Sequence, residues 1–530
     1  MFGFLRKLRK LSVLLKGKNS TRNYKNKVLE LTPDINANIR KFRQVLGESS
    51  DVIIRQFKIA RGGTAAALIF LDGLVDKKRI NEDILRPLMM HSQTSYSGTL
   101  KKLQESFIST DEIIEQKDFG ETVSAVLEGQ AALLLDGSAS SLVIDVKGWE
   151  ERAIEEPDTE GAVRGPREGF TENIRTNTAL LRRIIRDPDL TFHNLRLGER
   201  TKKDITIVYI KGIAQESLID EIKTRLGRIE TDAILESGYI EQYIDDNPFS
   251  PFPTVANSEK PDKVAAKLLE GRAAILIDGT PFVLTVPMLF IESFQNAEDY
   301  YVHPYFGTFM RWIRYISFAL SILSPAFFVA LSSFNQELIP TPLLISMTSA
   351  REGTPFPAVL EALLVIIIFE ILREASIRMP RSLGQAVNIV GALVIGQTAV
   401  SAGLIGPATV IVISLTAVST FIVPPLIDVG TFLRLALLFG AGILGLFGMT
   451  IILIEILIHM ASLQSFGVPY LSPVAPPSRG MVKDVFLRAP IWSMPLRPGI
   501  IGSQNPRRQG QQVESSSFKT RKNKRQRKNR

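Results

Sequence analysis

Six residues between Gln385 and Gly403 have the types and spacing to form a polar or small surface along one helix. At about 100° per residue they lie within about 60° of a common direction; they are Gln385, Asn388, Ala392, Gly396, Ala399 and Gly403. A small, weakly polar face leaves room for water and ions, so the stripe is a candidate lining of a narrow conduit. Small residues and amides also let membrane helices pack closely. A packing seam therefore explains the same pattern, and the spacing alone leaves both interpretations open.

Four charged residues precede this stripe and could set the charge at the mouth of a conduit. They are Glu370, Glu374, Arg378 and Arg381. The two acids are four residues apart and so share one helix face, with Arg373 beside them. The two arginines continue the stripe one helical turn earlier. Ionisable residues in such an apolar segment are expected to face protein or water.

Catalytic and metal-binding patterns do not emerge from the rest of the sequence. Asp136 and Asp278 could suggest acid and base catalysis, but each precedes a Gly in a turn-like stretch, where Asp is favoured for backbone reasons. No two of the four His residues are three or four positions apart, and the sequence contains no Cys. We therefore predict no enzyme activity, no cofactor and no metal site.

The composition predicts a chain that is partly soluble and partly embedded in a membrane. Its 530 residues are 22% charged, with a mean hydropathy of +0.12. A helical span needs about 20 apolar residues, and such runs are absent from 1–300 but recur within 315–460. Uncharged runs predict spans at 315–336 and 435–454. The uncharged stretch 383–427 predicts two more, separated by the Gly and Pro residues near 403–407.

The segment 354–381 differs from these spans. Its apolar run, 362–369, covers eight residues, which is about 12 Å of helix and too short to cross alone. We expect residues 354–378 to be interfacial or re-entrant, which leaves four full crossings.

Basic residues give conflicting signals about orientation. Arg311 and Arg314 before the first span, and the basic end of the chain after the last, both favour the cytoplasm, which requires an even number of crossings. Arg373, Arg378 and Arg381 favour the same side. These segments satisfy all three clusters only if one of them is re-entrant.

The net charge of +9 is carried by the end of the chain. Residues 506–530 contain ten Lys or Arg and one Glu. Such a segment has too little apolar surface to bury and is predicted to be a disordered tail that binds anionic lipid headgroups or another acidic surface. Nucleic-acid binding is not expected, because a solvated basic tail beside a membrane is the commoner case.

The soluble half contains an internal repeat. "LEGQAALLLDGSASSLVIDV" (127–146) recurs as "LEGRAAILIDGTPFVLTVP" (269–287), and each copy has the pattern of a β-hairpin with an Asp-Gly turn. Upstream of each copy, at 66–89 and 205–226, a buried strand, a Gly turn and an amphipathic helix are expected.

These patterns predict an α/β N-terminal soluble region of two similar lobes, an all-α polytopic membrane domain and a disordered tail. The predicted segments are a basic amphipathic leader (1–26), a first α/β lobe (27–150), a hinge and linking helix (151–190), a second α/β lobe (191–300), a transmembrane domain (305–465), a Pro-rich cytoplasmic segment (466–505) and the basic tail (506–530).

Three long stretches carry a family resemblance. They are "GPREGFTENIRTNTALLRRIIRDPDL", "SAREGTPFPAVLEALLVIIIFEILREASIRMPRSLGQAVNIVGALVIGQTAVSAGLIGP" and "HMASLQSFGVPYLSPVAP". They resemble the A subunit of the GerA-type spore germinant receptors of endospore-forming bacteria, and the resemblance covers about residues 25–490. It implies a receptor in the inner membrane of the spore, with the N-terminal region and tail in the cytoplasm. It also implies a transporter-like B subunit and a C lipoprotein as partners, and nutrients as triggers.

The resemblance further implies a homo-oligomer that acts as a nutrient-gated ion conduit, which favours the conduit interpretation of the 385–403 stripe. Two alternatives remain. One is a scaffold or signal-transducing subunit whose partner binds nutrient and carries ions. The other is a transporter, which predicts inverted repeats within the membrane half. No such repeat is visible there, because the duplication lies in the soluble half.

Overall fold

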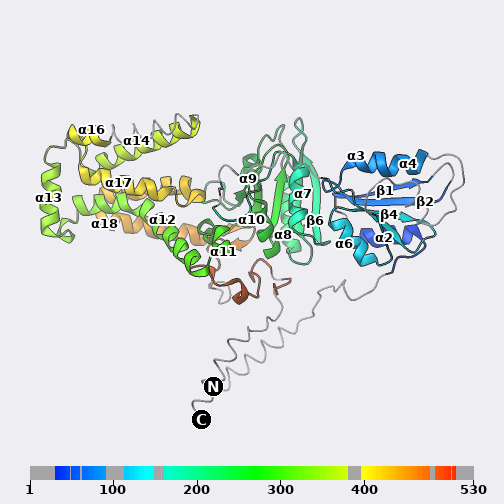
Figure 1. Ribbon diagram of the computed structural model, residues 1–530. Helices are drawn as coiled ribbons and strands as arrows, with labels where there is room; N and C mark the ends of the chain where they lie inside the picture. Colours follow the sequence, from blue (N-terminus) through cyan, green and yellow to red (C-terminus); the bar gives the residue numbers. More distant parts are fainter. Residues whose placement is uncertain are drawn as a thin grey trace, which may run out of the picture. The chain divides into compact units, whose positions relative to one another are not determined.

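The computed structural model describes residues 30–47, 49–59, 63–90, 113–148, 157, 160–161, 163–379, 396–477, 484–502 and 504–508. The predicted leader, 1–26, lies outside these residues. Contacts divide the chain into two compact units (Figure 1). One comprises residues 1–154, 170–195 and 206–211, and the other comprises 155–169, 196–205 and 212–530.

The first lobe is built on a five-stranded antiparallel sheet with the strand order β1-β2-β4-β5-β3. Its strands are β1 (Val52–Lys58), β2 (Ala65–Leu71), β3 (Ile113–Gln116), β4 (Ala131–Leu135) and β5 (Ser141–Ile144). The central strands β2 and β4 are apolar almost throughout because side chains on both faces of the sheet are buried. Period-two alternation is therefore missing where burial is two-sided.

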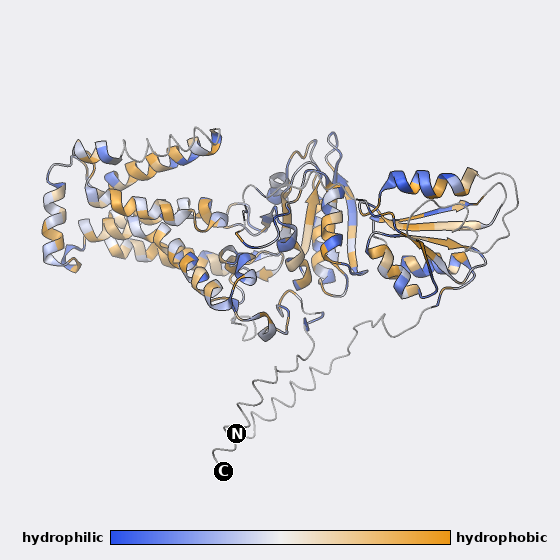
Figure 2. Cartoon of the chain, in the orientation of Figure 1, coloured by the Kyte–Doolittle hydropathy of each residue, from blue (hydrophilic) through white to orange (hydrophobic). Residues whose placement is uncertain are grey.

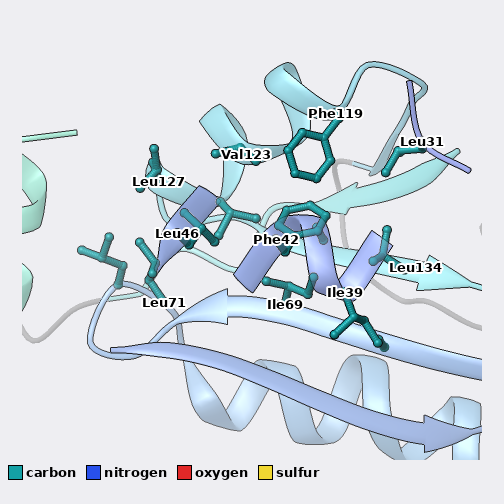
Figure 3. Close-up of a cluster of buried hydrophobic side chains, with 14 of the residues drawn as sticks. Leu31, Ile39, Phe42, Leu46, Ile69, Leu71, Phe119, Val123, Leu127 and Leu134 are labelled. Atoms are coloured by element: carbon teal, nitrogen blue, oxygen red, sulfur yellow. The ribbon is translucent and has the colours of Figure 1, made fainter. Parts of the chain in front are cut away.

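Helices cover both faces of this sheet. The α2 helix (Ile35–Leu46) and α6 (Phe119–Leu127) pack Phe42 and Phe119 over Ile69 and Leu134 (Figure 3). On the other face, the helical stretch of α3 (Lys77–Arg79), η2 (Ile80–Leu85) and α4 (Arg86–Met90) buries Ile84. The predicted strand, turn and helix at 66–89 are confirmed.

The second lobe repeats the topology, with the strand order β6-β7-β9-β10-β8. Its strands are β6 (Leu190–Leu197), β7 (Lys203–Ile210), β8 (Ala256–Ser258), β9 (Ala273–Ile277) and β10 (Val283–Val286). Its helices are α8 (Glu216–Gly227), α9 (Ser237–Ile244) and α10 (Pro261–Glu270). The prediction of two similar α/β lobes is confirmed.

The two predicted hairpins are equivalent in detail. Asp136 and Asp278 each follow the first strand of a hairpin, and their N–H groups donate to Ala65 (2.9 Å) and Asp204 (3.0 Å) on the neighbouring strand. The glycines after them, Gly137 and Gly279, have φ values of 85° and 86°, in the region that favours Gly. Both aspartates are therefore turn residues, as the sequence indicated.

The linking helix α7 (Ile174–Ile184) begins at Asn173, whose side chain accepts the N–H of Arg175. It belongs to the first compact unit. Its Arg182 is fully buried, and its Nε donates to Asp51 Oδ2 at 2.7 Å. Because both side chains of this ion pair are buried, separating them would leave unpaired charges in the interior. The pair therefore holds α7 within this unit.

The C-terminal half is helical and rich in apolar residues (Figure 2). A short helix, α11 (Glu298–Tyr301), precedes the long α12 (Pro304–Ser333). The remaining labelled helices are α13 (Thr341–Arg351), α14 (Ala358–Arg378), α16 (Gly396–Ser401), α17 (Pro407–Thr420) and α18 (Ile427–Ser462). The all-α assignment of this half is confirmed.

The α18 segment contains two helical arms, because the chain reverses at Gly445. This residue has φ 60° and ψ −139°, and it interrupts the helical backbone. A Cβ on Gly440 would lie 3.1 Å from the carbonyl oxygen of Gly448, although eight residues of straight helix extend about 12 Å. Val429 near the start and Met460 near the end share one apolar cluster with Phe252 of the second lobe. Both ends of α18 therefore lie at the same end of the helical domain, which we call the lobe end.

The opposite, far end contains the reversal at Gly445, which lies against Phe334 after α12. The predicted span 435–454 is therefore wrong, since its centre is a turn. The arms 427–444 and 446–462 are instead about 27 Å and 26 Å long. Because both begin or end at the lobe end, this segment adds an even number of passes.

Other predicted spans also change. Within the described residues, α12 and the stretch Pro424–Ser462 have the length and hydropathy to cross a membrane, but the second is divided into two arms at Gly445. The α12 helix begins at Pro304, eleven residues before the predicted start of its span. The α17 helix has 14 residues, about 21 Å, which is short of a bilayer core of about 30 Å. The segment 354–378 contains one continuous helix of 21 residues, α14, so it does not turn back on itself.

Candidate functional site

The described part of the predicted stripe lies on α16 and the turn after it. Gly396 and Ala399 are on α16, which ends at Ser401, and Ala399 lines an apolar pocket of about 400 Å³ with Leu364 and Ile368 of α14. Gly403 has φ 67° and is not helical, so the predicted stripe is wrong at its last member. A left-handed residue ends a helix, and the chain turns there toward α17.

The first half of the stripe, Gln385, Asn388 and Ala392, lies outside the described residues, as does Arg381. Arg378 ends α14, and the next residue, Met379, is extended with φ −90° and ψ 150°. The expectation that Arg378 continues the helix face of the stripe is therefore wrong. Instead, its Nη2 lies 2.6 Å from Glu374 in an exposed ion pair.

Glu370 has a different environment from Glu374 and faces the other helices. Its carboxylate lies 3.4 Å from Nη1 of Arg434 and accepts the Thr431 hydroxyl at 3.2 Å. Arg373, one turn along α14, is 2.8 Å away. The expectation that the acids of this helix face protein or water agrees with this geometry, because Glu370 faces protein and Glu374 is exposed.

The side chain of Arg434 connects several helices of this domain. It lies on α18 and is fully buried. Its Nε donates to the Ser321 carbonyl of α12 (3.0 Å), and its Nη2 donates to the Thr420 hydroxyl of α17 (2.9 Å). Together with Glu370 of α14, these contacts join α18 to three other helices through one guanidinium. Burying a charge among apolar helices is costly unless it is paired and hydrogen-bonded, and here each guanidinium nitrogen has a partner.

A second buried charge lies at the far end. Glu361 of α14 is fully buried, and it accepts hydrogen bonds from the Gly406 N–H (3.3 Å) and the Thr409 hydroxyl (2.9 Å) at the start of α17. Its other oxygen accepts from Arg351 (3.3 Å) and Thr354 (3.1 Å). Since Gly406 has no side chain to cap the helix, Glu361 satisfies N-terminal groups of α17 from a neighbouring helix.

The short helix α17 therefore has a buried carboxylate at its start and a buried guanidinium at its end. These signs match the helix dipole, which is positive at the N-terminus and negative at the C-terminus. The α17 helix follows directly from the turn after α16, so the same contacts fix the described end of the predicted conduit segment. We call Glu361, Arg434 and their partners the α17 end contacts.

Sequence reasoning missed both of these charges. Arg434 directly precedes the uncharged stretch 435–454 and so lies just outside the predicted span. Glu361 directly precedes the apolar run 362–369. The available signal was the isolation of each charge beside an apolar segment, which marks a functional or structural position in membrane helices. No group of three or more His, Asp or Glu suited to a metal ion occurs in the part of the chain that the structure describes.

A further charged cluster lies at the lobe end, where α12 begins. The fully buried Arg311 lies 3.1 Å from the Asp484 carboxylate and 3.5 Å from Asp299. Arg488 donates its Nε to the Asp299 carbonyl at 2.9 Å, and the Tyr315 hydroxyl donates to Val485 at 3.0 Å. The segment 484–488, which follows α18 along the chain, therefore packs against the start of α12.

Comparisons with known proteins agree with one another. The family described as Bacillus/Clostridium GerA spore germination protein matches residues 40–500. Spore germination protein KA of Bacillus subtilis (strain 168) is 42% identical over 92% of this chain and 90% of that protein. Spore germination protein GerLA of Bacillus cereus is 40% identical over 89% of this chain and 96% of that protein.

A crystal structure of the N-terminal domain of the A subunit of the Bacillus megaterium spore germinant receptor GerK3 is also similar. It is 36% identical, covers 50% of this chain and 99% of that chain, and has a TM-score of 0.41.

Proposed function

Because this chain belongs to the GerA family of spore germination proteins, we propose that it is the A subunit of a nutrient germinant receptor in the inner membrane of the spore. In this role it acts with a transporter-like B subunit and a lipoprotein C subunit. We further propose that several copies assemble around an axis and form a nutrient-gated ion conduit, with the part of the stripe from Gln385 to Ala399 of each copy facing the axis.

The observation that most supports a gated element is the pair of α17 end contacts. A short helix packed against α12 and α14, with a buried charge at each end, is a discrete element, and we propose that it moves between two positions rather than deforming continuously. It is joined to α16 by the turn at Gly403, so a displacement of α17 would move the stripe. Nutrient binding then needs to favour only the arrangement in which the α17 end contacts are broken and replaced by others.

The same-end arrangement of the helices supports a proposal for the orientation of the receptor. Because Arg311 at the start of α12 and Asp484 after the last helix are in contact, the soluble region and the C-terminal segment belong on one side of the membrane. We propose that this side is the cytoplasm, since it carries the basic tail.

Ion flux through the purified protein tests the proposed conduit. The full chain would be reconstituted in liposomes loaded with a K⁺ reporter, alone and together with the B and C subunits, with and without a nutrient mixture. Nutrient-dependent flux with either preparation that is abolished by Ala392→Leu or Gly396→Leu supports the conduit. Flux that needs only the partner subunits and is unaffected by both changes would favour the scaffold alternative.

Germination of spores provides the second measurement. Ile389→Ala and Ile395→Ala remove volume on either side of the stripe, at about 100° per residue, and should loosen the closed packing, giving germination without nutrient. Val387→Ala, on the opposite face, is the matched control and should alter only receptor abundance. Ile405 does not serve as a second control, because it lies in the turn before α17. If Ile389→Ala and Val387→Ala had the same effect on abundance alone, the stripe would be a packing seam.

A further inference from the structure

The first part of α12 exposes large apolar side chains along one face. Tyr305, Phe309, Trp312 and Ile316 recur at helical spacing and are 82%, 60%, 45% and 54% exposed. The opposite face carries Arg311, which is held by Asp299 and Asp484. These buried ion pairs fix the rotation of the helix, so the aromatic face remains outward.

The C-terminal segment extends the same surface. The ring of Phe486 lies 6.3 Å from that of Trp312, and Phe486 is 42% exposed. The residues after it include further exposed apolar side chains, namely Leu487, Ile491, Trp492 and Leu496. We call the exposed residues of 305–316 and 486–496 the aromatic platform. Soluble surfaces rarely expose so many large apolar side chains together unless the patch docks on something.

The position of the platform indicates what covers it. The α12 helix has 30 residues and is about 45 Å long, which exceeds a bilayer core of about 30 Å. Its last turn reaches the far end of the bundle, since Phe334, the residue after it, lies against Gly445. The first ten or so residues therefore project beyond the apolar core at the lobe end. That level is occupied by lipid headgroups, where Trp and Tyr side chains are favoured.

Charge also favours a lipid surface. Arg497 donates to the Arg507 and Asn505 carbonyls, and its N–H donates to Pro506 at 2.8 Å, so the chain turns back here into its basic end. Ten Lys or Arg and one Glu follow from residue 506 onward. Basic residues close to an anionic membrane are attracted to its surface. A surface that combines exposed aromatic rings with such a tail matches an anionic bilayer better than a neutral protein surface.

We propose that the aromatic platform docks on the anionic lipid surface of the bilayer that the receptor's own helices cross. The platform is also attached to the second lobe. The Arg497 Nε donates to the Leu269 carbonyl at 2.7 Å, and Gln215 donates to the Ile500 carbonyl at 3.0 Å. Docking therefore sets the position of this lobe against the membrane, and the lipid composition of the leaflet influences that position.

Tryptophan fluorescence of the full chain tests the proposal, because the sequence contains three Trp residues, Trp149, Trp312 and Trp492. The variant Trp149→Phe/Trp312→Phe keeps Trp492 as the reporter. It would be placed in vesicles of phosphatidylcholine with or without phosphatidylglycerol, with bromine near the carbonyl end of the acyl chains. We expect quenching of about two-fold with phosphatidylglycerol and clearly less without it, or at high salt.

A reporter elsewhere in the second lobe is the matched control. Tyr239→Trp, on α9, is an exposed aromatic position outside the platform, and it would be made in a chain with all three native Trp residues changed to Phe. It should not be quenched. Equal quenching of both reporters, or none of Trp492 in any lipid, would overturn the proposal. Shielding of Trp492 from a soluble quencher that depends on receptor concentration and not on lipid would assign the platform to a second copy, which also overturns it.

Deleting residues 509–530 separates the two contributions of the surface. These residues are beyond the Pro506 contact and contain most of the basic charge. The deletion should remove the difference between the two vesicle types and leave the salt-insensitive part of the quenching. Complete loss of quenching on deletion would show that the tail binds lipid without the platform and would overturn the role assigned to the aromatic residues.

Discussion

Arg434 is the side chain of the helical domain whose removal should cost most. Arg434→Gln removes the ion pair with Glu370 and the hydrogen bonds to Ser321 and Thr420. Breaking one side of a fully buried ion pair typically costs about 3–5 kcal/mol, and we expect a smaller cost here because Glu370 is 21% exposed and keeps Arg373 at 2.8 Å. We expect a fall in the thermal unfolding midpoint of the purified receptor. Arg378→Gln is the matched control, because its pair with Glu374 is exposed; an equal effect of the two changes would contradict the importance of burial.

Glu241 should make the second lobe sensitive to pH. Burial, with repulsion from Asp245 and Glu236, raises its pKa from 4.5 to about 7. The folded protein therefore holds a proton that the unfolded chain has lost between these two values, so stability falls as pH rises through this window. Glu241→Gln should remove up to about 2 kcal/mol of this fall, since the side chain is only partly buried. The difference between the denaturant midpoints at pH 5 and pH 8 measures this fall in stability. An unchanged difference in the variant would refute the assignment.

At the scale of elements, the reversal of α18 depends on Gly445. Its backbone conformation is one that L side chains rarely adopt, and a Cβ there would lie 2.7 Å from the Phe334 Cβ. Gly445→Ala should cost about 1–3 kcal/mol from backbone strain, and more from the clash. Gly430→Ala, on the first arm of the same segment, is the control because its nearest neighbour would be 3.9 Å away. Receptor abundance in the membrane should fall for the first variant alone; tolerance of both would mean that the arms can separate.

For the whole molecule, the proposed placement of the soluble region and the tail on one side of the membrane predicts where each part can be labelled. The chain has no Cys, so single cysteines are unambiguous reporters. Ser217→Cys on α8 and Ser515→Cys in the tail should react with a membrane-impermeant maleimide from one side. Ser346→Cys on α13, at the far end, should react only from the other side. Labelling of Ser217→Cys and Ser515→Cys from opposite sides would contradict the contact between Arg311 and Asp484 as a constraint on topology.

The duplicated lobes, both Asp-Gly turns and the division into soluble and helical halves are predictable from the amino-acid sequence. These features depend on local spacing, because a strand, a Gly turn and an apolar helix each leave their pattern in neighbouring residues. The family resemblance was equally visible, since its motifs are continuous stretches.

How the helices pack against one another is visible in the tertiary structure and not in the sequence pattern. The stretch 435–454 is uniformly apolar, so hydropathy does not distinguish one straight helix from two arms that reverse at Gly445. Arg434 and Glu370 are 64 residues apart, and their pairing is set by how four helices pack. Glu361 and the start of α17 are likewise distant along the chain. A buried charge acquires its role from the partners that packing places beside it, and a one-dimensional pattern records the charge without those partners.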